Sequence, residues 1–182
     1  AGGAVAVVRT VDNILPNPPI AQKRILLDPT TVGAGALMQP VDGAGIMKAA
    51  LGKEGVEVDS FRPTGKGREG FTVAASSVID NYDLLLYACN LTTKSNQTTV
   101  RIEWEQPMGA NCPIYITSLP TIFVSFANPF HLQDVPRIRT FINAYSFKDV
   151  TIQAVLDKLL GRSEFKGKDP VDSFCGMWDT RL

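Results

Sequence analysis

Residues 139–161 read RTFINAYSFKDVTIQAVLDKLLG, and this stretch decides the fold. It opens with Phe141, Ile142 and Ala144, an apolar run of the length typical of a buried strand. Ser146 is the expected helix N-cap, with Asp149 three residues later in the manner of a capping box. The following apolar positions recur at helical spacing and end at a glycine: Ile152, Val155, Leu156, Leu159, Leu160 and Gly161. A buried strand that leads directly into an amphipathic helix is the repeating unit of a parallel α/β sheet.

The same alternation of apolar runs and helical patterns continues through the rest of the chain. The expected elements are a strand at 25–27, a helix through 46–51 ended by Gly52, a strand nearer the edge at 56–61, a helix through 71–82, and central strands at 84–89 and 121–127. The runs at 84–89 and 121–127 are apolar at nearly every position, which is typical of strands covered on both faces. The sequence therefore predicts an α/β fold, a three-layer α/β/α sandwich with a mostly parallel sheet.

Residues 90–120 break this rhythm. Thr98 to Trp104 alternates β-branched and charged residues, which predicts an extra strand or ribbon outside the main sheet. Pro107, Gly109 and Pro113 then exclude a long regular element.

Size and charge exclude several classes of function. The 182 residues suffice for one domain with a substantial core, but not for a catalytic barrel and a second domain. Lys+Arg and Asp+Glu both total 18, so no net charge attracts nucleic acid or an anionic membrane. The apolar runs are shorter than the roughly 20 residues of a membrane span. The start AGGAVAVVR has no Met and no signal-peptide pattern, which suggests an excised part of a longer chain.

The three cysteines are Cys89, Cys112 and Cys175, an odd number at wide spacing. They match neither a disulfide framework nor a zinc site, so we expect free thiols in a reduced compartment, the cytoplasm. An extracytoplasmic location would require a signal in a preceding segment. With one histidine and scattered cysteines, the sequence supports no metal site.

Three short motifs carry a resemblance to a known family. Gly161, Phe165, Gly167, Lys168, Pro170 and Val171 form a G-x-x-x-F-x-G-K-x-P-V run after the last helix. Asp12, Asn13, Leu15 and Pro16 give a D-N and an L-P near the start, and residues 143–146 read NAYS. Together these motifs resemble the C-terminal domain of glycoside hydrolase family 3, and the NAYS stretch resembles its bacterial β-N-acetylhexosaminidase branch in particular.

The resemblance implies that residues 1–182 are a single C-terminal α/β domain, with an opening or linker segment at 1–20 and a tail at 161–182. It implies a parent enzyme that removes terminal β-linked N-acetylglucosamine, with the catalytic nucleophile on a separate barrel that precedes residue 1. The partner of this domain is then that barrel. The domain meets the glycan substrate only indirectly, and it needs no cofactor. By itself the chain is expected to be inactive.

Gly65, Gly67 and Gly70 spell G-x-G-x-x-G between an expected strand and helix, where backbone amides could receive a pyrophosphate. Arg62 to Thr64 separate the strand from the first glycine, whereas a dinucleotide fingerprint needs the turn at once. The next strand also ends without an acid for a ribose hydroxyl. A flexible loop is the better interpretation. A free-standing flavodoxin-like module that binds a nucleotide or small molecule nevertheless stays open as an alternative function.

His131 is the single histidine, so any Ser–His–Asp arrangement would run through it. It follows the strand at 121–127, where open α/β sheets carry their ligand loops. No nucleophile elbow G-x-S-x-G is present in the sequence, and we expect a surface or interface histidine rather than a catalytic one.

Glu103 and Glu105 are the candidates for a pair of glycosidase carboxylates. They flank Trp104 on an expected strand and would therefore share one face, with Cβ atoms about 7 Å apart. An exposed polar face predicts the same pattern without catalysis. In the glucosidase branch of the family, a loop after a central strand supplies an acid/base glutamate. The matching loop at 90–100 has no carboxylate, which agrees with the N-acetylhexosaminidase branch, where an Asp–His pair on the barrel transfers the proton.

We expect the barrel-facing or active-site-mouth residues to follow the central strands: Asn90, Asn128, Pro129, Phe130 and His131. An apolar patch for the missing barrel is expected from the loop Pro129, Phe130, His131 and Leu132, from Trp104, Pro107 and Met108, and from Phe174, Met177 and Trp178 in the tail. The tail aromatics could instead fold back onto the domain's own core. A homodimer and a pure protein-interaction domain also remain open.

Overall fold

A computed structural model describes residues 2–16, 24–27, 43–61, 79–92, 101–102 and 115–180 of the chain. Its strands are β1 (Ala6–Thr10), β2 (Arg24–Leu27), β3 (Val58–Phe61), β4 (Leu84–Cys89), β5 (Thr121–Ser125) and β6 (Thr140–Asn143). Its helices are α1 (Gly43–Lys53) and α3 (Asp149–Leu159), with short 3₁₀ turns η1 (Gly2–Ala4), η2 (His131–Gln133) and η3 (Trp178–Thr180). Residues 79–81 are also helical.

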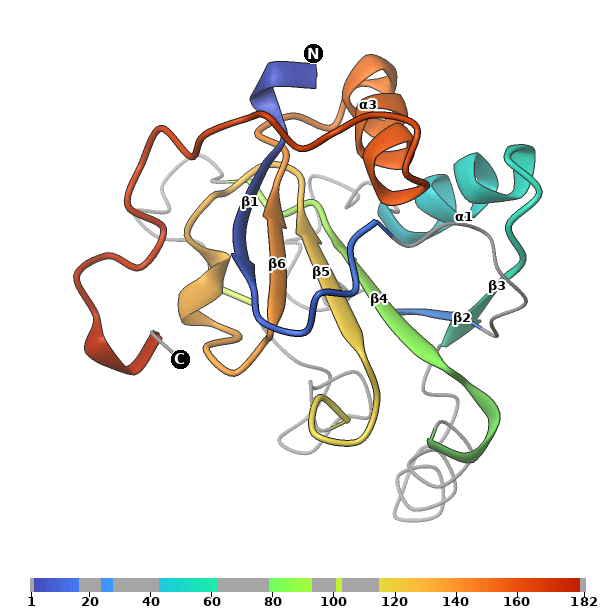
Figure 1. The fold of residues 1–182 in the computed structure, drawn as a ribbon, viewed down its shortest axis with the longest axis horizontal. Helices are drawn as coiled ribbons and strands as arrows, with labels where there is room; N and C mark the ends of the chain where they lie inside the picture. Colours follow the sequence, from blue (N-terminus) through green and yellow to red (C-terminus); the bar gives the residue numbers. More distant parts are fainter. Residues whose placement is uncertain are drawn as a thin grey trace, which may run out of the picture.

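The strands form one sheet in the order β1-β6-β5-β4-β2-β3. All neighbours run parallel except β1, which pairs antiparallel with β6 at one edge (Figure 1). The predicted α/β class with a mostly parallel sheet is confirmed. The five parallel strands follow the flavodoxin-like order, in which the first strand of the series lies between the second and the third.

Side chains of the central strands are buried on both faces of the sheet, as the continuous apolar runs predict. On β4, Leu84, Leu86 and Ala88 belong to the core cluster under α1 and α3, and the alternate positions belong to a second cluster on the other face. Figure 1 shows α1 and α3 on the same side of the sheet. On the other face Tyr87, Phe123 and Phe141 stack across β4, β5 and β6, with ring centroids 5.5 and 5.2 Å apart.

The ends of the helices differ from the sequence-based expectation. Lys148, not Ser146, is the N-cap of α3, and its side chain makes no capping hydrogen bond. Ser146 Oγ instead accepts the Lys148 N–H at 3.3 Å, because it lies two residues too early to reach the first amides of the helix. α1 runs through Gly52 to Lys53, and Gly55 (φ 76°) supplies the left-handed turn. Gly161 ends the last helix as predicted, with φ 77°.

Other predictions fall partly outside the described residues. Arg101 and Ile102 lie in no strand, and the rest of the proposed ribbon at 98–104 is outside them. So are the G-x-G-x-x-G at 65–70 and most of the helix at 71–82. The helices of the described part are all too short or too polar to cross a membrane.

The C-terminal tail passes the start of β1 and then lies on the free side of that strand, away from it (Figure 1). Ala6 forms a parallel bridge to Gly167 there. A Cβ at position 167 would lie 2.3 Å from the Val5 carbonyl oxygen and 2.8 Å from that of Gly3. The glycine of the G-K-x-P-V run is therefore required because two backbones touch at this point.

Leu156→Ala on α3 should destabilise the domain by about 2–5 kcal/mol, because it opens a cavity among buried side chains. Leu156 is 1% exposed, whereas Val150 on the same helix is 61% exposed, so Val150→Ala serves as the matched control. Urea unfolding of the two variants checks this. Equal midpoints would show that α3 is not docked as described.

Gly167→Ala should destabilise the domain by about 1–3 kcal/mol, since the new methyl group forces the tail away from β1. Gly52→Ala is the control, because a Cβ there meets nothing within 4 Å and alanine favours a helix by up to about 1 kcal/mol. Thermal unfolding should move in opposite directions for the two variants. A neutral Gly167→Ala would contradict the close approach.

Candidate functional site

The candidate site lies at the carboxyl ends of β4, β5 and β6, the edge where open α/β sheets bind ligands. Asn90 comes directly after β4, half-buried beside the start of α1. A Cβ at Gly43 would lie 3.4 Å from the Asn90 Cβ. The loop after β5 and the segment after β6 form the rest of this edge, and the C-terminal tail is bonded to the η2 turn and to the end of β6.

The loop after β5 is held by its own polar groups. Ser125 Oγ donates to the Asn128 carbonyl at 2.6 Å, and Asn128 Oδ1 accepts the Phe130 N–H at 2.9 Å. These bonds satisfy backbone groups as the chain leaves the sheet, and they lead into the short η2 turn. Asn128 therefore shapes the loop.

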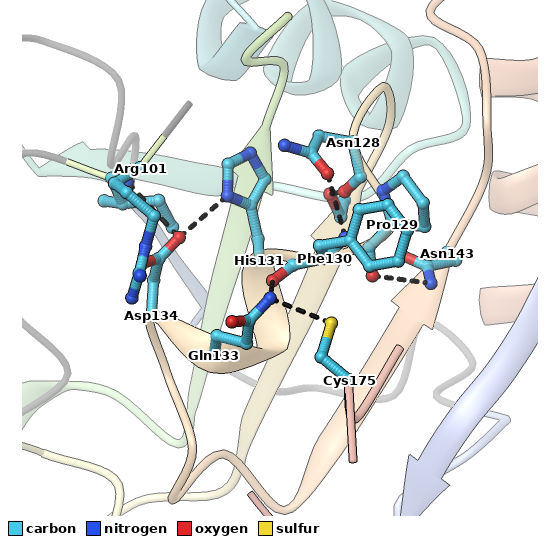
Figure 2. Close-up of polar contacts among 11 residues, drawn as sticks. Arg101, Asn128, Pro129, Phe130, His131, Gln133, Asp134, Asn143 and Cys175 are labelled. Carbon is cyan, nitrogen blue, oxygen red and sulfur yellow. Dashed lines mark hydrogen bonds and ion pairs between the residues drawn. The ribbon is translucent and has the colours of Figure 1, made fainter. Parts of the chain in front are cut away.

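His131 at the start of η2 is fully buried and pairs with Asp134, with Nδ1 2.9 Å from Oδ2 (Figure 2). Asp134 also accepts the Ile102 N–H at 3.3 Å and forms an ion pair with Arg101. An ionised carboxylate only accepts hydrogen bonds, so we assign the proton of the imidazole to Nδ1. Nε2 is then buried and has no partner among the described residues. The arrangement orients the ring, but it does not expose a base to solvent.

A buried amide joins three segments of this edge. Asn143, the last residue of β6, points its Nδ2 at the Pro129 carbonyl at 3.2 Å and at Ser173 Oγ at 2.9 Å. Ser173 Oγ donates to Asp169 Oδ2 at 2.5 Å, and the same carboxylate oxygen lies 3.4 Å from the Asn143 amide. Asn143 and Ser173 are almost fully buried. The cluster fastens the tail to the ends of β5 and β6.

Two further groups hold the tail. Arg9 on β1 donates to the Pro136 and Ile138 carbonyls at 2.7 and 2.8 Å, and its guanidinium lies 5.6 Å from the centroid of the Phe174 ring. Burial lowers the pKa of this guanidinium. Gln133 Nε2 donates to Cys175 Sγ at 3.0 Å. Partial burial and then the neighbouring Asp172 carboxylate raise the pKa of the Cys175 thiol, which disfavours the nucleophilic thiolate.

Backbone conformation marks the end of β6. Tyr145 lies in the left-handed region, with φ 59°, two residues after the strand. A bulky residue there is uncommon and is held by its surroundings. Its hydroxyl is buried, without a partner in the described part of the chain.

The arrangement favours a structural role over proton transfer. The described acids of the edge are already hydrogen-bonded, and the histidine is buried. Within the described ranges no three His, Cys, Asp or Glu side chains gather to hold a metal ion. Cys89 is buried and Cys175 is exposed, and neither is in a disulfide. Cys112 lies outside the described residues.

The five residues predicted to face a barrel are brought together only in part. Asn128 to His131 form one loop, next to the end of β6, while Asn90 follows β4. His131 and Leu132 are fully buried in the domain itself, so the expectation of a surface or interface histidine is wrong. Leu132 belongs to the core cluster beneath η2. Phe130 is exposed. That this loop faces a barrel stays a prediction. Glu103, Glu105, Trp104, Pro107 and Met108 lie outside the described residues.

Five residues that hold this edge were not predicted from the sequence: Arg9, Asp134, Asn143, Asp169 and Ser173. Two signals could have indicated them. Asn143 is a polar residue at the end of an otherwise buried strand, where a partner is needed. Asp134 follows His131 by three residues, the spacing of one helical turn.

Known proteins with similar sequences or structures show what this chain is related to. No protein-family profile matches it. A curated protein of Cellulomonas fimi, described as a "Beta-N-acetylglucosaminidase/beta-glucosidase", is 51% identical over 149 residues, 82% of this chain. The solved "Beta-glucoside phosphorylase BglX" aligns over 99% of the chain with 36% identity and a TM-score of 0.80. A glycoside hydrolase family 3 β-N-acetylglucosaminidase from Paenibacillus sp. aligns over 90% of this chain and 29% of its own, with a TM-score of 0.57 at 13% identity, which shows the fold alone.

The chain belongs to glycoside hydrolase family 3. It spans about a quarter of the curated relative (25%) and 31% of the solved phosphorylase. It therefore corresponds to one domain, the C-terminal domain, of larger family 3 polypeptides.

Asn143→Ala should destabilise this family 3 domain by about 1–3 kcal/mol, because the Pro129 carbonyl and the Ser173–Asp169 pair lose a buried donor. Hydrogen exchange at residues 169–175 should also speed up, since the tail loses its anchor. Asn128→Ala is the control: it removes an exposed bond worth less than about 1 kcal/mol. Unchanged exchange in the tail of Asn143→Ala would contradict the anchoring role.

Proposed function

We propose that this chain is the non-catalytic C-terminal domain of a family 3 enzyme whose parent polypeptide acts on terminal β-N-acetylglucosaminides. The observation that supports this substrate class is the 51% identity to a protein described as a β-N-acetylglucosaminidase/β-glucosidase. By the family resemblance, the nucleophile and the Asp–His acid/base pair belong to the barrel of the parent.

The local chemistry supports a non-catalytic role for this domain. Residues 90–100, the loop in which glucosidases of the family carry their acid/base glutamate, include no carboxylate. His131 is buried against Asp134, and Asp169 is bonded by Ser173. None of these groups is placed to exchange a proton with an external glycoside. The domain then stabilises the barrel and forms one wall of the active-site mouth with its carboxyl edge.

The proposal extends to the compartment. The three cysteines, Cys89, Cys112 and Cys175, are odd in number and widely spaced, a pattern that fits a reduced, cytoplasmic location better than a disulfide framework.

A second candidate is a parent that transfers a β-glucosyl group to phosphate. It is favoured by the solved β-glucoside phosphorylase, which matches nearly the whole chain at 36% identity. Both activities break a β-glycosidic bond and differ in whether water or phosphate accepts the sugar. The sugar and the acceptor can therefore be tested separately.

The test uses the complete parent polypeptide and the isolated 182-residue chain side by side. Each is assayed with aryl β-N-acetylglucosaminide and aryl β-glucoside, with and without inorganic phosphate. The parent should prefer the N-acetylglucosaminide, and the chain should turn over neither sugar while its circular dichroism shows it folded. Phosphate-dependent release of a sugar phosphate from the glucoside would favour the second candidate. Turnover by the isolated chain would contradict the non-catalytic role, and its loss on Glu103→Gln or Glu105→Gln would assign the active carboxylate.

A further inference from the structure

Two buried oxygen atoms have no hydrogen-bond partner at the point where the tail meets the end of β6. Asn143 and Ser173 are 0% and 1% exposed, and the Asp169 carboxylate contacts both. Within the described part of the chain, Asn143 Oδ1 and Asp169 Oδ1 are buried and accept no hydrogen bond. Such acceptors are rare in native proteins, and a bound ion is one of the few groups that satisfy them.

The side chains that carry these two oxygens lie against each other. Asn143 Nδ2 is 3.4 Å from Asp169 Oδ2, and it donates to Ser173 Oγ at 2.9 Å and to the Pro129 carbonyl at 3.2 Å, the bond that Figure 2 shows. Ser173 Oγ lies 2.5 Å from the same Asp169 Oδ2. Each unpaired oxygen shares its carbon atom with an atom of this contact. We call Asn143, Asp169, Ser173 and the Pro129 carbonyl the tail cluster.

The tail cluster holds more acceptors than donors. The two amide protons of Asn143 serve the Pro129 carbonyl and Ser173 Oγ, and the single hydroxyl proton of Ser173 serves Asp169 Oδ2. None of the three side chains has a further proton for Asn143 Oδ1 or Asp169 Oδ1.

The charge of the tail cluster is also unbalanced. Asp169 takes part in none of the ion pairs among the described residues. The neighbouring Lys168 is exposed. One carboxylate charge therefore stands beside two unused acceptor oxygens, and a cation satisfies both the charge and the lone pairs.

The chemistry of the donor set selects the class of cation. All its ligand atoms are oxygens, from a carboxylate, an amide, a hydroxyl and a backbone carbonyl, which are the ligands of hard cations. A single carboxylate balances one positive charge, whereas Ca²⁺ takes about 6–8 oxygens and binds more tightly as their charge increases. Because both unpaired oxygens are buried from solvent, a small dehydrated ion fits better than a water molecule.

We propose that Asn143 Oδ1 and Asp169 Oδ1 bind a monovalent hard cation, Na⁺ in preference to the larger K⁺, and that this ion fastens the tail to the end of β6. The site does not depend on the activity of the parent enzyme, so its test is separate from that of the proposed function.

Hydrogen exchange in the complete parent polypeptide tests the site with the ion alone. Local release of the tail also releases the ion, so its amides gain protection by the factor 1 + [Na⁺]/Kd. Amides of residues 169–175 should exchange about fivefold more slowly when NaCl at about four times the Kd replaces choline chloride at equal ionic strength. KCl should protect them less. The turn at residues 52–55, after α1, is the internal control and should exchange alike in all three salts.

A pair of variants assigns the effect to the tail cluster. Asp169→Asn keeps the shape of the side chain and an acceptor for Ser173, but it removes the charge, so exchange at 169–175 should become equal in NaCl and choline chloride. Thr140→Val is the matched control. Thr140 Oγ1 is also buried without a partner among the described residues, but it lies at the opposite end of β6. This variant should keep the sodium effect.

Three results would overturn the proposal. The first is equal exchange of the unaltered polypeptide in NaCl and choline chloride, which would leave the unpaired oxygens to a water molecule and requires no variant. The second is sodium protection that survives Asp169→Asn. The third is protection by millimolar CaCl₂ without any by NaCl, which would show a divalent site.

Discussion

The Asn143 amide is the interaction on which the carboxyl edge of this domain depends. Asn143 is the last residue of β6. Its amide bonds the Pro129 carbonyl in the loop after β5 and the Ser173 hydroxyl in the tail, 30 residues further along the chain. Such a group is costly to bury without partners, and here its donors are used by a carbonyl and a hydroxyl. The same two segments are also held by Asn128 at Phe130, by Arg9 at Phe174 and by Gln133 at Cys175.

Local sequence patterns predict most strands of the sheet, but not the edge strand β1 or the ends of the helices. The runs at 84–89 and 121–127 are apolar on both faces, so they identify central strands without any knowledge of neighbours. β1 could not be found in this way, because its partner β6 lies more than 120 residues away along the chain. The N-cap of α3 was misplaced by two residues and the terminal glycine of α1 by three, since serine and glycine occur within reach of several possible ends. The burial of His131 was not predicted, because a single histidine has no local sequence pattern that distinguishes a core position from a surface position.

The strand order explains why two different functions could be inferred from one chain. A flavodoxin-like series of parallel strands serves nucleotide-binding modules and other domains alike, so topology alone does not choose between them. The choice comes from particular residues and relatives: the glycine at 167 that lets two backbones touch, and the 51% identity to a family 3 relative. For the candidate site too, the topology had to be combined with particular residues. Its location at the strand ends was predictable from the fold, whereas the bonds among Asn143, Ser173 and Asp169 needed the tail in place.

The antiparallel strand β1 ends the sheet with a row of backbone groups, and the bridge from Ala6 to Gly167 places the tail against that row. An unpaired strand edge is a template for another chain. The position of the tail therefore bears on how the domain is produced for study. A protein trimmed after Leu160 would keep its last helix but uncover β1, and it would be prone to edge-to-edge aggregation. Fusion partners and purification tags are better joined beyond the tail than in place of it, because the tail covers the start of β1.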